Sequence, residues 1–456
     1  MSGSEAAASI HHPEKGITMF RGFTRSAAVV AAGAALLLAA TGCSGGSSSS
    51  PSSSGSSSET GATLSLWTFI DPNAAGDPRA AALKDVVASY NAQSKNKVEV
   101  RSINYATIDS EVIKATASGN GPDIVNVYSN QLAQHVDAGT IQPITKYAKP
   151  YLDKLGKDYI FPTKGVTFNG EIMALPWETR AWLLWYRADL LQQAGLSEPK
   201  TLDELGTVAA ALQKTGKTGL GIGFSSQGLG ADFAEKFIPL TIGNGGTILD
   251  KDGKAAFASK AGAETLDYLK KIHDQGAFGD EVLNMAADDV VNGVKAGTIA
   301  MAIEGSFRVA SARAGEGIGD NLKTMPIPSD KAGTPTKTPV AGQTLAIGST
   351  TKHADAAWDF IKYYTSKESQ EKFAAAGVLP VLSSAYDAPS VKALPNYSEL
   401  IQWRDYVLKN GVSNPATAAY NQLTDALVTA GQQAVFKGAG SAAALKDAAQ
   451  TFDSSH

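Results

Sequence analysis

Strands and helices alternate regularly between residues 64 and 138, and this order most constrains the fold. Residues 64–69 and 98–103 alternate between apolar and polar side chains as strands do, and residues 123–127 are almost continuously apolar. Residues 78–92 and 108–117, between these strands, repeat apolar side chains at helical spacing. Because neighbouring parallel strands need a crossover helix, the order predicts a parallel, doubly wound sheet of the α/β class.

Further helices and strands are predicted in the rest of the chain. Helical spacing recurs at residues 130–138, 201–214, 232–242, 261–275, 288–296 and 354–365. Short strands are predicted at residues 299–303 and 345–347, and the C-terminal part is largely helical. A chain of 456 residues is long enough for two domains.

The residues that follow the first strands are the first candidates for a binding site. In open α/β sheets, ligands bind beyond the carboxyl ends of strands, near a switch in strand order. Trp67, Asn104, Tyr105, Ser129 and Asn130 stand at these strand ends. We therefore expect ligand contacts among them.

Cys43, the only cysteine, follows a segment with the pattern of a secretory signal. Arg21 and Arg25 precede the apolar residues 27–40, and small residues lead into Cys43. The apolar run is too short to span a bilayer, which takes about 20 residues. The junction resembles a bacterial lipobox, although Ala40 stands where that motif usually has leucine.

Residues 1–43 are therefore predicted to be a signal peptide that ends at a lipidated cysteine. Met19 is an alternative start, and a plain cleavable signal is the alternative to lipidation. Two or more acyl chains suffice for stable membrane anchoring. Residues 44–60 are rich in Ser, Gly and Pro, which predicts a disordered tether. The body would then lie on the extracellular face of the cytoplasmic membrane.

Composition and motifs exclude several classes of function. The formal net charge is −4, with no basic stripe, which argues against nucleic acid as a partner. The few histidines are scattered, and no Cys/His spacing typical of a metal site occurs, so neither metal nor cofactor is expected. The segment GFSSQ (223–227) lacks the final glycine of a nucleophile elbow. We expect no catalytic residues.

A series of short motifs runs in one order through residues 64–385. They are GPDIV (121–125), AGTIQPI (138–144), GEIMALPWE (170–178), WYRADLL (185–191), AGL (194–196), PKTLDEL (199–205), KAGTIAM (295–301), AAWDFIK (356–362) and GVLP (377–380). The series resembles extracellular solute-binding protein family 1, the carbohydrate-binding lipoproteins of ABC importers. The best-known member of that family is the maltose-binding protein.

The resemblance implies a periplasmic-binding-protein-like clamp of two α/β lobes with the ligand cleft between them. The N-terminal lobe would comprise residues 61–178 and 340–366, and the C-terminal lobe residues 179–339 and 367–456. A three-segment hinge is expected near residues 177–179, 339–342 and 364–368. The resemblance also implies a monomer that delivers its ligand to the permease subunits of an ABC transporter.

A sugar site needs aromatic rings against the C–H faces of the sugar and planar polar groups for its hydroxyls. The candidate ligand contacts lie at the strand ends, at the crossings and on one central helix. They are Trp67, Ser129, Asn130, Glu178, Thr179, Arg180, Trp182, Asp232, Asn244, Glu304, Phe307 and Gln343.

Several of these candidates also have a purely structural interpretation. Trp67, Trp182 and Phe307 are alternatively core residues, and Glu178 and Arg180 alternatively form an ion pair. Trp182 and Trp185 would point to opposite faces of one strand. Trp177 is expected to pack at the hinge, Trp358 in a helix core, and Asp288-Asp289 to cap the helix that follows.

The sequence therefore predicts a membrane-anchored receptor that captures a sugar or oligosaccharide and is not an enzyme. One alternative is a receptor of the same fold for a polyamine, glycerol phosphate or peptide. The other is a lipoprotein glycoside hydrolase, which would use two carboxylates about 5–10 Å apart.

Overall fold

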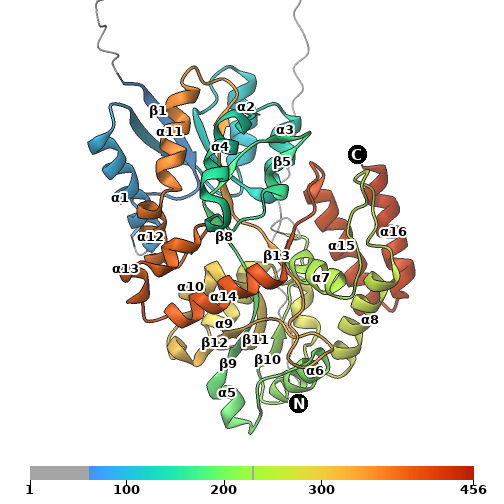
Figure 1. Ribbon diagram of the computed structural model, residues 1–456. Helices are drawn as coiled ribbons and strands as arrows, with labels where there is room; N and C mark the ends of the chain where they lie inside the picture. Colours follow the sequence, from blue (N-terminus) through green and yellow to red (C-terminus); the bar gives the residue numbers. More distant parts are fainter. Residues whose placement is uncertain (1–60, 76, 228–230, 456) are drawn as a thin grey trace, which may run out of the picture. The chain divides into compact units, whose positions relative to one another are not determined.

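The computed structural model of the protein describes residues 61–75, 77–227 and 231–455. The predicted signal peptide, Cys43 and the tether lie outside these residues. The described chain forms two α/β lobes, each built around its own sheet (Figure 1). This arrangement is the predicted fold class.

The N-terminal lobe contains a six-stranded sheet of order β2-β1-β3-β14-β4, with β7 also paired to β14. Its strands are β1 (Thr63–Thr68), β2 (Lys97–Ser102), β3 (Ile124–Tyr128), β4 (Ile141–Gln142), β7 (Leu175–Pro176) and β14 (Gln343–Gly348). Its helices are α1 (Pro78–Gln93), α2 (Ile108–Ala117), α3 (Leu132–Asp137), α4 (Thr145–Leu155), α11 (Ala354–Tyr364) and α12 (Lys367–Ala375).

The direction of the strands is only partly as predicted. β1, β2 and β3 are parallel, as the alternation of strand and helix requires. β14 runs antiparallel to β3, β4 and β7, so the sheet is mixed. Periodicity within a strand carries no information about its direction, and β14 arrives from about 200 residues later in the chain.

The C-terminal lobe contains a four-stranded sheet of order β10-β11-β9-β12. Its strands are β9 (Trp182–Arg187), β10 (Thr218–Gly221), β11 (Ile299–Gly305) and β12 (Leu322–Met325). Its helices are α5 (Ala188–Gln193), α6 (Leu202–Gln213), α7 (Ala231–Gly243), α8 (Lys260–Asp274), α9 (Ala287–Lys295), α10 (Val309–Arg313), α14 (Tyr397–Asn410), α15 (Tyr420–Val435) and α16 (Ser441–Ser454). Every residue of β9 and β11 is buried, because helices cover both faces of this sheet.

Shorter elements complete the chain. The two-stranded pairs are β5 (Thr167–Phe168) with β6 (Glu171–Ile172), β8 (Glu178–Thr179) with β15 (Leu379–Pro380), and β13 (Thr338–Val340) with β16 (Gly411–Ser413). The short helix α13 (Pro389–Lys392) lies between α12 and α14 in the sequence. Single 3-10 turns include η1 (Ser129–Gln131) and η5 (Ser306–Arg308).

Two of the predicted crossing segments lie side by side between the lobes. The backbone N–H of Arg180 donates to the carbonyl of Ala341 at 2.8 Å, and Trp177 donates to the carbonyl of Gln343 at 3.0 Å. Gly342 lies between these contacts, where an added Cβ would come within 2.0 Å of the Glu178 carbonyl oxygen. Only glycine therefore allows the two strands to approach this closely.

The predicted boundary between the two lobes at residues 366–367 lies too early in the sequence. α12 was assigned to the C-terminal lobe, but it contacts α1 of the N-terminal lobe. Its Phe373 ring lies 4.7 Å from Trp177, and Trp177 lies 5.2 Å from Tyr364. These buried rings join α11 and α12 into one core, which the local sequence pattern does not reveal.

Local sequence signals explain several helix ends. Asp77 accepts a hydrogen bond from the N–H of Arg79 and precedes Pro78 at the first position of α1. Asp289 accepts from the N–H of Ala286, which confirms the predicted capping role for Asp289, whereas Asp288 pairs with Arg308. Within the described residues, no helix is both long and apolar enough to cross a membrane.

Replacing Trp177 by alanine should destabilise the fold by about 3–5 kcal/mol, the usual cost of removing a buried large ring. Trp177 is fully buried and its indole N–H donates to Asn126 at 3.3 Å. Urea denaturation would measure the change. The matched control is Leu408→Ala, whose side chain is 52% exposed and should change stability by less than about 0.5 kcal/mol. A Trp177→Ala protein as stable as this control would contradict the packing described.

Candidate functional site

A cavity of about 470 Å³ lies between the two lobes. Side chains from the strand ends of the N-terminal sheet, from a crossing segment and from helices of both lobes form its wall. They are Phe69, Arg79, Tyr105, Tyr128, Gln131, Arg180, Glu235, Ala287, Asp288, Val291, Asn292, Phe307, Arg308, Ser311, Tyr420 and Asn421. The cavity is therefore the interlobe cleft that the two-lobed fold predicts.

Five aromatic rings face this cavity. Phe69 follows β1, Tyr105 follows β2 and Tyr128 ends β3, so three rings come from the carboxyl ends of parallel strands. Phe69 and Tyr105 meet edge to face, with ring centroids 5.3 Å apart. Phe307 in η5 and Tyr420 at the start of α15 face them from the C-terminal lobe.

Arg180 joins the two sets of rings. Its guanidinium lies 5.0 Å from the Tyr128 ring and 4.0 Å from the Phe307 ring, within cation–π range of both. Its buried side chain is ion-paired with Glu178. Burial works to lower the pKa of Arg180, but the Glu178 carboxylate together with Tyr128 and Tyr105 outweighs that effect, and the pKa is raised. The guanidinium therefore stays charged between two rings of opposite lobes.

A buried ionic cluster lies behind the wall of the C-terminal lobe. Lys236 is fully buried; it pairs with Asp232 one turn earlier on α7 and lies 3.2 Å from Glu304 of β11. Asp232 also accepts a hydrogen bond from the N–H of Gly223 at 2.6 Å. Asp232 and Glu304 were predicted to contact the ligand, but the structure engages both with Lys236 instead.

Glu235 is the carboxylate of α7 that does line the cavity. It accepts a hydrogen bond from the indole N–H of Trp182 at 2.9 Å. Trp182 itself is fully buried in the core of its lobe, and Trp185 packs into a different cluster, as opposite faces of one strand require. Sequence reasoning missed Glu235. The usable signal was its place on the same predicted helix as Asp232.

Of the twelve predicted site residues, only Arg180 and Phe307 line the cavity. Trp67 is 6% exposed and packs beneath the guanidinium of Arg101 at 4.2 Å. Phe69, on the same side of the chain two residues later, reaches past the sheet edge into the cleft. The prediction for the first strand was thus two residues too early.

The predicted polar residues at the end of β3 support the wall rather than form it. The N–H of Gly342 donates to Ser129 Oγ at 3.2 Å, and Asn414 donates to Asn130 Oδ1 at 3.0 Å. Neither Ser129 nor Asn130 lines the cavity, but the next residue, Gln131, does.

Buried polar atoms without a hydrogen-bond partner gather near the crossing strands. Among the described residues they include both ends of the Gln343 amide, the Tyr128 hydroxyl, Thr179 Oγ1 and Asn130 Nδ2. Gln343 and Tyr128 are cross-strand partners in the pairing of β14 with β3. Buried polar groups normally have partners, and of these four residues only Tyr128 lines the cavity.

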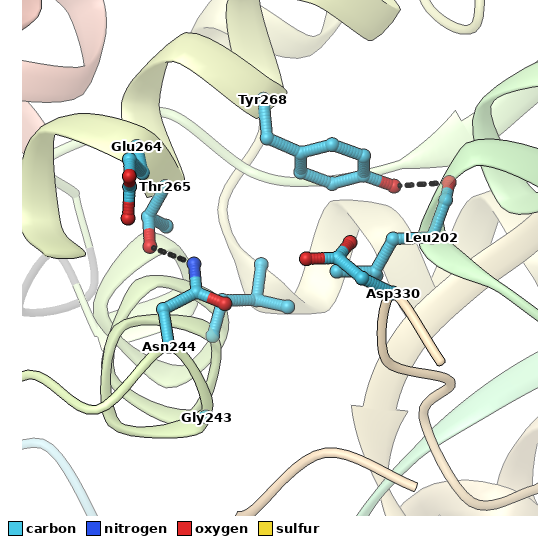
Figure 2. Close-up of a pocket in the computed structure, with 8 residues that line it drawn as sticks. Leu202, Gly243, Asn244, Glu264, Thr265, Tyr268 and Asp330 are labelled. Atoms are coloured by element: carbon cyan, nitrogen blue, oxygen red, sulfur yellow. Dashed lines mark hydrogen bonds between the residues drawn. The ribbon is translucent and has the colours of Figure 1, made fainter. Parts of the chain in front are cut away.

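Asn244 lies elsewhere, in a second cavity of about 540 Å³ within the C-terminal lobe (Figure 2). Its amide donates to Thr265 at 3.4 Å, and Glu264 and Asp330 stand at the same cavity. Asn244 is thus not brought together with the cleft residues.

In the described part of the chain, no group of three or more His, Cys, Asp or Glu side chains is placed to hold a metal ion.

Comparison with known proteins identifies the family. The family model described as bacterial extracellular solute-binding protein matches residues 74–371. The chain belongs to this family. Membership implies a location outside the cytoplasm, as the sequence predicted.

Relatives of this solute-binding protein include several named binding proteins. It is 28% identical to a probable ABC transporter-binding protein of Deinococcus radiodurans over 61% of this chain and 68% of that protein. It is 25% identical to the diacetylchitobiose binding protein DasA of Streptomyces coelicolor over 70% of this chain and 73% of that protein. Among solved structures, the cyclic α-maltosyl-1,6-maltose binding protein of Arthrobacter globiformis has a TM-score of 0.74 at 22% identity, over 86% of this chain and 98% of that chain. That likeness shows the shared fold.

The stability of this solute-binding protein should fall as pH rises between about pH 5 and pH 8 through Glu304. Burial raises the pKa of Glu304 to about 8, Lys236 opposes the rise, and the nearby Asp232 carboxylate adds to it. The folded state therefore holds a proton that the unfolded state releases above about pH 4.5, so the unfolding free energy decreases across this interval and levels off above it.

Glu304→Gln should flatten this slope in urea denaturation measured across the pH series. Glu264→Gln, at the second cavity, serves as the matched control and should keep the wild-type slope. An unchanged slope in Glu304→Gln would show that Glu304 does not titrate in this interval.

Proposed function

We propose that this protein is a receptor that captures an oligosaccharide between its lobes and delivers it to an ABC importer permease. The observation that carries the proposal is one cavity walled by five aromatic rings from both lobes. Aromatic faces suit the apolar C–H faces of sugar rings, and the polar groups beside them suit the hydroxyls. The diacetylchitobiose-binding and cyclic-maltosyl-maltose-binding relatives support a carbohydrate ligand.

The charges of the cavity wall argue against an anionic ligand such as glycerol phosphate. Each lining arginine already lies at ion-pair distance from a carboxylate. The pairs are Arg79–Asp77, Arg180–Glu178 and Arg308–Asp288. A phosphate would have to share a guanidinium that already pairs with a carboxylate of the same charge sign as the phosphate, whereas a neutral sugar hydroxyl meets no such repulsion.

Membrane anchoring through Cys43 completes the proposal. The signal-like segment and the lipobox-like junction support export and lipidation, and the Ser-rich residues 44–60 would let the body reach a permease. Binding without catalysis fits a family of solute-binding proteins. The ligand should accordingly be recovered intact after incubation, and cleavage products would instead favour the hydrolase alternative.

Oligosaccharides that bind should raise the thermal stability of the protein. At a ligand concentration about 100 times the dissociation constant, binding should add roughly 2.7 kcal/mol to the unfolding free energy. A thermal-shift series with neutral di- to tetrasaccharides would measure this, with tryptophan fluorescence as a second readout. A series in which no oligosaccharide shifts the melting temperature would contradict the proposal.

Phe307→Ala should weaken oligosaccharide binding at least about tenfold, because it removes a ring that faces the cavity. Isothermal titration calorimetry would measure the loss. Leu408→Ala, an exposed position away from the cavity wall, is the control and should bind as the wild type does. Equal affinities for Phe307→Ala and the wild type would place the ligand elsewhere.

A further inference from the structure

Glu235 differs from every other charged side chain of the cavity wall. The three lining arginines and Asp288 are all in ion pairs. Within the part of the chain that the structure describes, no Lys, Arg or His lies at ion-pair distance from Glu235, whose only hydrogen bond comes from Trp182 to Oε2. Its Oε1 therefore remains as an acceptor at the cavity wall.

The cations near Glu235 are engaged elsewhere. Lys236, the next residue on α7, is fully buried and held by Asp232 and Glu304. Arg308 in η5 is paired with Asp288. Burial raises the pKa of Glu235, Lys236 acts against this rise, and Asp232 adds to it. A partly buried carboxylate in this position is stabilised by a proton or by a cation from outside the protein.

Three phenol rings line the same cavity as this carboxylate. Tyr105, Tyr128 and Tyr420 all line the cavity together with Glu235. Burial raises the pKa of each of these phenols, and the charge of Glu235 contributes to the rise in all three. A carboxylate among aromatic faces is a setting that favours a cation, through both the charge and the ring quadrupoles.

We propose that Glu235 receives a basic nitrogen of the ligand, so that the cleft prefers amino-substituted oligosaccharides to their hydroxyl counterparts. The proposal rests on the oligosaccharide function and adds the chemical group that would be recognised. The protonated amine would donate to Glu235 Oε1, and the rings would contact the sugar faces on either side. The amine would supply the positive partner that Glu235 lacks at the cavity wall.

The test compares three tetrasaccharides that differ only in the group on C2 of each ring. They are the glucosamine tetramer with an amine, its fully N-acetylated form with an acetamide, and cellotetraose with a hydroxyl. Calorimetry at neutral pH measures binding to the wild type and to Glu235→Gln. Gln keeps the shape of Glu and can still accept the Trp182 hydrogen bond. A melting curve of each variant confirms that it is folded.

The wild type should bind the glucosamine tetramer at least about tenfold more tightly than cellotetraose. This ratio is what the free energy of one charge-assisted hydrogen bond would give. Glu235→Gln should lose this preference and still bind cellotetraose. Glu264→Gln, which changes an acid of the second cavity, should keep the wild-type preference. Equal binding of the three sugars by the wild type, or an equal loss of all three in Glu235→Gln, would overturn the proposal.

Spermidine separates this proposal from the oligosaccharide function. One outcome is that spermidine binds to the wild type, that Glu235→Gln abolishes this binding, and that no sugar binds. The basic-nitrogen site would then stand and the oligosaccharide function would fall. If cellotetraose binds but neither spermidine nor the glucosamine tetramer does, the oligosaccharide function stands and the basic-nitrogen site falls. If no probe binds, both are wrong.

Discussion

The Glu178–Arg180 ion pair lies where the two lobes, the crossing strands and the cleft meet. Arg180 is hydrogen-bonded through its backbone to Ala341 of the second crossing segment, and its guanidinium lies between Tyr128 of one lobe and Phe307 of the other. Removing one partner of a buried pair usually costs about 3–5 kcal/mol, because the other charge is left uncompensated. The pair therefore fixes the position of the guanidinium between Tyr128 and Phe307, and the shape of the cleft depends on it.

A second group of buried, paired charges lies behind the cleft, in the core of the C-terminal lobe. Lys236 engages both Asp232 and Glu304 in the core, so these acids link α7 to β11 instead of facing a ligand. Glu235, one residue before Lys236, turns to the cavity and is left with an indole N–H as its partner. One helix thus supplies both a buried ionic cluster and a carboxylate at the cavity wall.

Much of the architecture was predictable from local patterns, and the reasons for the exceptions are physical. Periodicity placed α2 and α11 closely, because a 3.6-residue repeat of apolar side chains reflects burial of one face. It did not give the antiparallel direction of β14 or the packing of α12 on the N-terminal lobe, which depend on contacts between distant segments. Arg180 and Phe307 were singled out through the family resemblance, which implies a charged residue near the first crossing and a stacking aromatic after residues 305–306. Phe69 was missed because strand ends are uncertain by about two residues, and Glu235 because an acid on a helix looks the same in sequence whether a lysine or a cavity faces it.

The most direct test of the account is whether a ligand closes the two lobes around the cavity. Spin labels at Ser110 of α2 and Lys295 of α9, both exposed, would report the distance between the lobes in a Cys43→Ser background, where no other cysteine remains. Pulsed electron spin resonance with and without a bound oligosaccharide should show a shorter and narrower distance distribution with the ligand, as hinge closure requires. A distribution that is unchanged while calorimetry shows saturation would contradict the account, because the sugar would then bind outside the interlobe cleft.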